Sequence, residues 1–348
     1  MKELRIGNRI ISQQNPAYII AEMSANHAGS LSNALEIVHA AKESGADCVK
    51  VQTYTADTIT LDCRKPDFML QSGTWSGYNL HDLYKEAYTP WEWQGKIKEE
   101  AEKIGLDFLS TPFDNTAVDF LEDLNVDFYK IASSEIVDIP LIQYAAEKGK
   151  PMIISTGMAS VEEIEEAVMA VRSTGNDQLA LLKCSTLYPA IPQKMNLITV
   201  SDLAERFDVI SGLSDHSMGS LASVIAVALG GRIIEKHFCL DRRIKNPDSS
   251  FSMEPQEFKQ MVDEVRATQA AIGETPYSYG EDELYGRGFR RSLYVSKDIK
   301  SGEEFTAENL RSVRPGKGLH TRYYYEILGR KAACDIEMGT PLRWELVK

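Results

Sequence analysis

The feature that most constrains the fold is a repeated alternation of short apolar runs with amphipathic stretches. Eight runs rich in β-branched and apolar residues occupy 17–25, 48–53, 107–113, 127–133, 151–156, 179–185, 209–215 and 232–238. The runs are continuous, which is typical of parallel strands covered on both faces. Eight strand–helix units in about 250 residues predict a (β/α)₈ TIM barrel. An open doubly wound sheet is the alternative, but no GxGxxG follows the first run.

Two of the amphipathic stretches carry clear helix signals. Ser160, with Glu163 three residues later, predicts a capping box at a helix start. An apolar stripe follows at Val161, Ile164, Val168 and Val171. Pro255 predicts the first turn of the last helix. Its apolar face is formed by Phe258, Met261, Val262 and Val265.

The chain changes character after residue 272, so we predict a barrel over 1–272, a linker over 273–290 and a small β-rich domain over 291–348. The linker is rich in glycine and polar residues and lacks periodicity. The last segment contains short strands and tight turns at Ser301-Gly302 and Met338-Gly339. A domain of about 60 residues usually needs support from a neighbour. The insertion 57–89 is longer than an ordinary βα loop and is expected to cover the barrel mouth.

Composition limits the classes of function that the chain can have. The net charge of −13 argues against a broad surface that binds nucleic acid or an anionic membrane. No apolar stretch is long enough to span a bilayer, and the first residues lack a secretory signal. The cysteines are scattered and odd in number, which predicts reduced thiols in the cytoplasm. They are Cys48, Cys63, Cys184, Cys239 and Cys334.

Catalytic groups of a barrel lie at the carboxyl ends of its strands. Lys50 and Lys130 both lie inside apolar strand runs, where an unpaired charge is costly. Two ammonium groups with nearby hydroxyls predict a cradle for phosphate and carboxylate, although either lysine taken alone could be an ordinary surface residue. His216 and His237 end adjacent predicted strands, and two imidazoles there predict a site for Mn, Co, Fe or Zn.

Two carboxylates accompany these groups. Glu22 follows the first strand run and could serve as acid, base or hydrogen-bond acceptor, or simply be exposed. Glu235 shares a face with His237 and could hold a water. His27, in contrast, could belong to a structural turn that caps the next helix.

Motifs along the whole chain resemble those of the sialic acid (nonulosonic acid) synthase family. They are EMSANHAGS (22–30), KVQTY (50–54), STPF (110–113), YKIASSE (129–135), STGMAS (155–160), KCSTLYP (183–189), GLSDHS (212–217), EKHF (235–238) and VRPGKGL (313–319). The C-terminal part resembles the antifreeze-like (SAF) domain of that family. SANHAGS, QTYTADT and YTPWEW are most similar to the pseudaminic acid branch. Thr186 departs from the N-acetylneuraminate branch, which has asparagine there.

The resemblance implies a transferase that condenses phosphoenolpyruvate with 2,4-diacetamido-2,4,6-trideoxy-L-altrose and releases pseudaminic acid and phosphate. Phosphoenolpyruvate would be held by Lys50, Thr111, Lys130, Ser133, Ser155 and Ser214. His216 and His237 would hold Mn²⁺, Mg²⁺ or Co²⁺ to polarise the sugar aldehyde, and Glu235 would hold the attacking water. Glu22 would contact the sugar or move a proton. The rest of the sugar site would be Gln52, Thr186, Tyr188 and Asp248.

The resemblance also implies a domain-swapped homodimer, in which Arg314 of the small domain reaches into the partner's active site. Three alternatives remain open. An N-acetylneuraminate or legionaminic acid synthase would share the chemistry with another sugar. A class II aldolase would use the metal but release no phosphate. A non-catalytic sugar-phosphate sensor would bind ligand without metal-dependent turnover.

Overall fold

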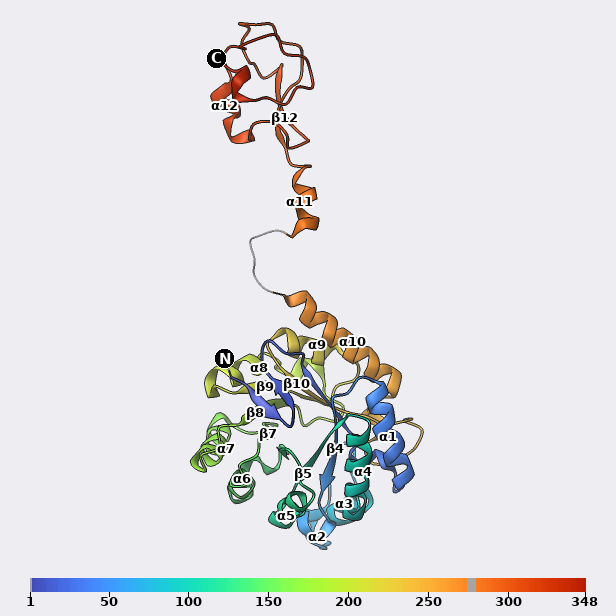
Figure 1. Cartoon of the computed structure of the whole chain (residues 1–348). Coiled ribbons are helices and arrows are strands. Elements are labelled where there is room, and N and C mark those ends of the chain that lie inside the picture. The colour runs from blue at the N-terminus through green and yellow to red at the C-terminus, as the bar shows by residue number, and fades with distance from the viewer. Residues whose placement is uncertain (1, 274–279) are drawn as a thin grey trace. The chain divides into compact units, whose positions relative to one another are not determined.

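The computed structural model describes residues 2–273 and 280–348. The chain divides into two compact units, Met1–Gly273 and Glu274–Lys348 (Figure 1). Among the described residues, no helix combines the length and the apolar character needed to cross a bilayer.

The first unit is a nearly closed barrel of eight parallel strands, in the order β5-β4-β3-β10-β9-β8-β7-β6. Strands β5 and β6, at the two ends of this order, pack against each other. The predicted TIM barrel is therefore confirmed, and each predicted run contains one strand. These strands are β3 (Tyr18–Glu22), β4 (Cys48–Thr53), β5 (Asp107–Pro112), β6 (Tyr129–Ile131), β7 (Met152–Ser155), β8 (Leu179–Cys184), β9 (Ile210–Asp215) and β10 (Ile233–His237).

Eight helices follow the strands and cover the outside of the barrel (Figure 1). They are α1 (Leu31–Glu43), α4 (Trp91–Lys103), α5 (Asn115–Asp123), α6 (Ile139–Ala146), α7 (Val161–Ser173), α8 (Thr199–Phe207), α9 (Leu221–Ala228) and α10 (Pro255–Ile272). The capping box of Ser160 and Glu163 is confirmed at the start of α7. The predicted stripe is wrong at Val161, which is 42% exposed because the first residue of α7 lies beyond the packed face.

The side-chain alternation of the strands divides the barrel interior into two zones. In β3, Tyr18 and Ile20 belong to the interior core, and Glu22 is the next residue on that face. In β10, Ile233 belongs to the same core, and Glu235 and His237 follow. The apolar residues between them, Ile19, Ala21 and Ile234, face outward and belong to the core between the barrel and the helices. The interior is thus apolar toward the amino ends of the strands and polar toward their carboxyl ends.

A hairpin of β1 (Leu4–Ile6) and β2 (Arg9–Ile11) supplies apolar side chains to the same interior core. At the carboxyl end, the insertion after β4 contains α2 (Ala56–Ile59), a 3₁₀ turn at Pro66–Phe68 and α3 (Leu80–Ala87). A 3₁₀ turn at Ser24–His27 follows β3, and buried His27 accepts a hydrogen bond from the Gly29 amide there. This supports the structural interpretation of His27.

The second unit has its own apolar core, to which Leu293, Phe305, Ile327 and Leu342 contribute. Its strands β11 (Ser292–Val295) and β12 (Leu310–Val313) pair antiparallel. Its helices are α11 (Glu281–Arg287) and α12 (Tyr324–Ile327), with 3₁₀ turns at Thr321–Tyr323 and Trp344–Leu346. Part of the predicted linker is therefore helical, whereas residues 274–279 lie outside the described chain. Gly302 and Gly339 adopt φ of +84° and +86°, as the predicted turns require.

Candidate active site

A row of polar side chains crosses the carboxyl end of the barrel because the parallel strands are in register. His237 of β10 pairs with Glu22 of β3, and Glu22 pairs with Lys50 of β4. Gln52 pairs with Thr111 of β5, and Glu235 pairs with Ser214 of β9. The strand ends therefore bring residues that are far apart in sequence into one small region.

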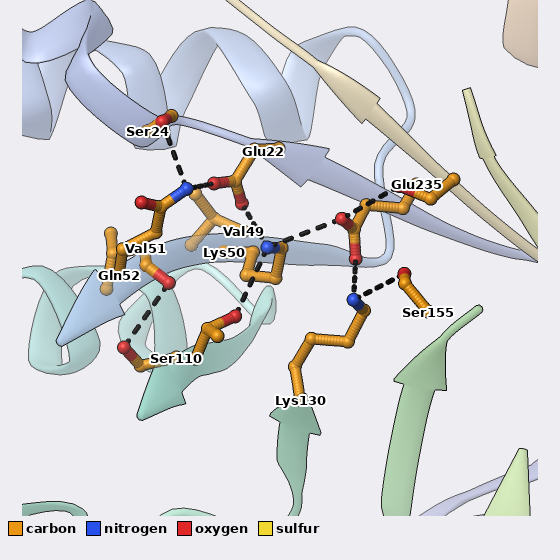
Figure 2. A network of polar contacts seen from close by, with 12 residues as sticks. Glu22, Ser24, Val49, Lys50, Val51, Gln52, Ser110, Lys130, Ser155 and Glu235 are labelled. Atoms are coloured by element: carbon orange, nitrogen blue, oxygen red, sulfur yellow. Dashed lines mark hydrogen bonds and ion pairs between the residues drawn. The ribbon is translucent and has the colours of Figure 1, made fainter. Parts of the chain in front are cut away.

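Lys50 lies at the centre of a buried ionic network (Figure 2). Its Nζ is 2.9 Å from Glu22 Oε2 and 3.3 Å from Glu235 Oε1. It also donates to Thr111 Oγ1 at 3.3 Å. The side chains of all three ionic residues are at most 7% exposed. An unpaired charge at this depth would be costly, so each ion depends on the others.

Lys130 approaches the same network from the other side of the barrel (Figure 2). Its Nζ donates to Ser155 Oγ at 2.6 Å and to the Ile131 carbonyl at 3.0 Å. It lies 3.8 Å from Glu235 Oε2. Glu235 thus connects the two lysines. Ser214 donates to Glu235 Oε1 at 3.3 Å. Both ammonium groups open on one end of the barrel, as the phosphate-cradle hypothesis requires.

The two carboxylates have pKa shifts of opposite direction. Burial raises the pKa of Glu22, and although Lys50 opposes this shift, Glu235 adds to it. Burial also acts on Glu235, but Lys130 and Lys50 hold the pKa of Glu235 below its usual value. Lys130 itself has a pKa lowered by burial, which Glu235 offsets only in part. Carboxyl groups that differ in this way can serve separately as acid and base.

His216 and His237 lie next to each other, with ring centroids 5.3 Å apart. His216 Nδ1 is 2.7 Å from the Ser185 carbonyl, so this nitrogen carries a proton and donates it to the carbonyl. His237 Nδ1 is buried and has no hydrogen-bond partner among the described residues. Burial and the neighbouring His216 hold the pKa of His237 well below its usual value, which keeps this imidazole neutral.

These two imidazoles fit a divalent metal in donor type. Neutral imidazole nitrogens are its common protein ligands. Within the described ranges, no cluster of three or more histidine, cysteine or acidic side chains has metal-binding geometry. A metal held by the two histidines would therefore complete its shell with solvent or substrate oxygens. Tyr188 stacks on His216 at 4.1 Å between ring centroids and restricts the orientation of this ring.

A cavity of about 380 Å³ opens above the network. Most of the predicted site residues line it: Glu22, Lys50, Gln52, Lys130, Ser133, Ser155, Thr186, Tyr188, Ser214, His216, Glu235, His237 and Asp248. Thr111 is not in the lining, although it binds Lys50. Arg314 belongs to the second unit, where it is exposed. Gln52 donates to Glu22 Oε1 at 2.9 Å, which orients this carboxylate.

Several lining residues were not predicted. Glu135 follows β6 in a 3₁₀ turn (Glu135–Val137), and its Oε2 is buried without a hydrogen-bond partner in the described chain. Cys184 ends β8, where its position on the inward face could have been read from the strand alternation. Trp75 comes from the insertion, and its Nε1 donates to the Pro247 carbonyl at 2.9 Å. A loop residue of this kind carries no periodicity that predicts where it lies.

Comparison with known proteins supports a common origin over the whole chain. Residues 37–277 match the NeuB family and residues 290–348 match the SAF domain. A pseudaminic acid synthase of Campylobacter jejuni is 46% identical over 98% of both chains. A pseudaminic acid synthase of Helicobacter pylori is 44% identical over 94% of this chain and 96% of the relative. The crystal structure of an N-acetylneuraminic acid synthetase from Leptospira borgpetersenii in complex with citrate has a similar fold, with a TM-score of 0.74. The two sequences are 31% identical, and the match covers 82% of this chain and 95% of that chain.

Proposed function

This chain belongs to the NeuB family, and we propose that it is a transferase that condenses phosphoenolpyruvate with 2,4-diacetamido-2,4,6-trideoxy-L-altrose to give pseudaminic acid and phosphate. The observation that carries the proposal is the convergence of Lys50, Lys130 and the histidine pair in one cavity. Ammonium groups suit an anionic substrate, and the histidines suit a metal that activates an aldehyde. The buried, free Cys48, Cys184 and Cys239 support a reaction in the reducing cytoplasm.

Lys50 and Lys130 would hold the phosphate and carboxylate of phosphoenolpyruvate, together with the hydroxyls of Thr111, Ser133, Ser155 and Ser214. Without substrate, both ammonium groups are neutralised by Glu22 and Glu235. An arriving anion competes for these ammonium groups and weakens their hold on the carboxylates. The proton affinity of both carboxyl groups then rises, which prepares them for proton transfer.

His216 and His237 would hold the divalent metal, Mn²⁺, Mg²⁺ or Co²⁺. When bound, the metal polarises the carbonyl of the open-chain sugar aldehyde. Gln52, Thr186, Tyr188 and Asp248 would orient the sugar, since all four line the cavity beside the histidines. The aldehyde carbon would then lie beside the histidine pair and near the two lysines.

The proton transfers follow from the opposite pKa shifts of the carboxyl groups. C3 of phosphoenolpyruvate forms a bond with C1 of the aldehyde, and C2 becomes electron-deficient. Glu22, whose pKa is raised, donates a proton to the aldehyde oxygen as the C1–C3 bond forms. Glu235, whose pKa is lowered, accepts a proton from the water that adds to C2. The tetrahedral intermediate collapses to a C2 ketone. The bond between C2 and the phosphate oxygen breaks, and the proton of the C2 hydroxyl leaves with the phosphate.

The proposal includes a homodimer in which Arg314 of one protomer completes the site of its partner. Arg314 is exposed in the second unit, so its guanidinium is accessible to another surface. A planar guanidinium can donate two hydrogen bonds to the acetamido or hydroxyl oxygens of the sugar.

Phosphate release from phosphoenolpyruvate tests the reaction directly. We expect release with 2,4-diacetamido-2,4,6-trideoxy-L-altrose, loss of release in EDTA, and recovery on addition of Mn²⁺. Release with N-acetylmannosamine in its place would identify a neuraminate synthase. Metal-dependent turnover without phosphate release would identify an aldolase. Ligand binding without turnover would identify a sensor.

A further inference from the structure

Two chemically different groups of side chains line the cavity beside the ionic network. One group is polar and consists of Ser133, Ser134, Glu135 and Thr186. The other group is apolar and belongs to the insertion after β4. We call this group the apolar wall, and it consists of Ile59, Leu70, Trp75, Leu80, Leu83 and Ala87. A substrate in this cavity therefore meets hydrogen-bonding groups as well as methyl and aromatic groups.

The apolar wall is attached to both sides of the barrel mouth. The insertion leaves from β4, and the Tyr84 ring packs edge-on against Tyr54 at 5.6 Å between centroids. Farther along, Trp75 donates to the Pro247 carbonyl and its ring lies 5.3 Å from that of Tyr188. Thr74 also donates to the Tyr188 carbonyl. The insertion is held by contacts at several points, so the wall can discriminate by shape.

We propose that the apolar wall is the specificity determinant of the sugar site and receives the C6 methyl group and the methyl of the 4-acetamido group. This inference rests on the proposed function, because it takes the sugar aldehyde to react beside the histidine pair. The insertion supplies most of the apolar lining of the cavity, so the methyl groups of the sugar are assigned to it. The hydroxyls and amide groups of the sugar are assigned to the polar group of the lining.

The wall would select by leaving a misplaced polar group without a partner. A 6-hydroxyl would lose its water against leucine and isoleucine side chains, which offer no hydrogen bond. An apolar pocket rejects an added hydroxyl by roughly 100-fold at most. We therefore expect the 6-deoxy sugar to exceed its 6-hydroxy analogue in kcat/KM by about 10- to 100-fold. A sugar with a 4-hydroxyl in place of the 4-acetamido group should be disfavoured in the same way.

Kinetics with three sugars test this selection. The wild-type enzyme is assayed with the natural sugar, with 2,4-diacetamido-2,4-dideoxy-L-altrose and with 2-acetamido-2,6-dideoxy-L-altrose. Leu70→Gln and Leu80→Gln place an amide in the wall. We expect each to reduce the preference for the 6-deoxy or 4-acetamido sugar at least five-fold, mainly through KM. Leu61→Gln is the matched control, since Leu61 belongs to the same insertion but is 66% exposed and outside the cavity lining.

Leu70→Ala gives a second measurement that does not introduce a polar group. It should weaken binding of the natural sugar without improving use of the 6-hydroxy analogue. Preferences equal to wild type in Leu70→Gln, Leu80→Gln and Leu70→Ala, with native circular dichroism spectra, would overturn the inference while the proposed function stands. If wild type releases no phosphate with the trideoxy sugar, the proposed function itself fails.

Discussion

Glu135 is one of the polar residues that line the cavity, and its Oε2 is buried. Burial raises its pKa from 4.5 to about 7, although its own backbone hydrogen bond and Lys130 act in the opposite direction. The folded state therefore binds a proton more tightly than the unfolded state between these two values. Folding stability falls as pH rises from 4.5 to about 7, and the loss is complete above that range.

Glu135→Gln should remove this loss because the amide does not ionise. At pH 8 we expect the free energy of unfolding of the variant to exceed that of wild type by about 1–3 kcal/mol. Its Tm should be correspondingly higher. At pH 4.5 the two proteins should melt at similar temperatures. Thermal melting at both pH values checks this. The exposed Glu165→Gln on α7 serves as control and should show no such pH-dependent difference. An equal Tm change at both pH values for Glu135→Gln would contradict the linkage.

At the residue scale, the sequence predicted the groups whose position follows from strand alternation. Lys50 and Gln52, two residues apart, do share one face, and so do Glu235 and His237. Glu135 and Trp75 could not be predicted in this way. The first lies in a 3₁₀ turn and the second in a long insertion, and neither element has a period that fixes side-chain direction.

The ends of β9 and β10 are joined by a buried ion pair on the outward face of the barrel. Lys236 Nζ lies 2.8 Å from Asp215 Oδ2, and both side chains are at most 1% exposed. Asp215 also accepts from Ser217 and Ser223, and Lys236 donates to the Ser217 carbonyl. His216 follows Asp215 directly after the end of β9, and His237 follows Lys236 as the last residue of β10. The ion pair therefore fixes the two strand ends that carry the histidines.

Lys236→Met should leave the Asp215 charge buried without its cation and destabilise the protein by about 3–5 kcal/mol. Asp215→Asn should have a similar effect through the uncompensated ammonium group. The double variant Asp215→Asn/Lys236→Met has neither charge and should recover most of the loss. Urea denaturation of the three variants and wild type gives the coupling energy. A double variant as unstable as the sum of the single variants would show that the two charges do not interact.

At the element scale, the strands could be predicted because each is a continuous apolar run bounded by polar residues. The start of α7 could be predicted from its capping box, which is a local signal. The short helix α11 was missed because its seven residues, which include Gly286, have no apolar stripe. Val161 was assigned to the stripe of α7 because periodicity alone does not show where a helix face leaves the packed core.

At the scale of the whole molecule, periodicity and composition distinguished a barrel from a small β-rich domain, and the structure has two compact units. How the units of two protomers combine is not encoded in a local pattern. The proposal about Arg314 therefore needs an experiment in which the barrel and the arginine come from different chains. For this purpose, one variant of the chain carries an inactivated barrel site and a second variant lacks the arginine.

Co-expression of Lys130→Met with Arg314→Ala tests whether the active site is shared. Random pairing makes about half of the dimers mixed. If the arginine acts in the partner's site, each mixed dimer contains one complete site, so about a quarter of all sites are intact. We expect phosphate release near a quarter of wild type and well above that of either variant alone. If subunits do not exchange between dimers, mixing the two separately purified variants should not restore this activity, whereas co-expression should. If the arginine acts within its own chain, neither chain of a mixed dimer has a complete site, and activity should not exceed the mean of the two variants.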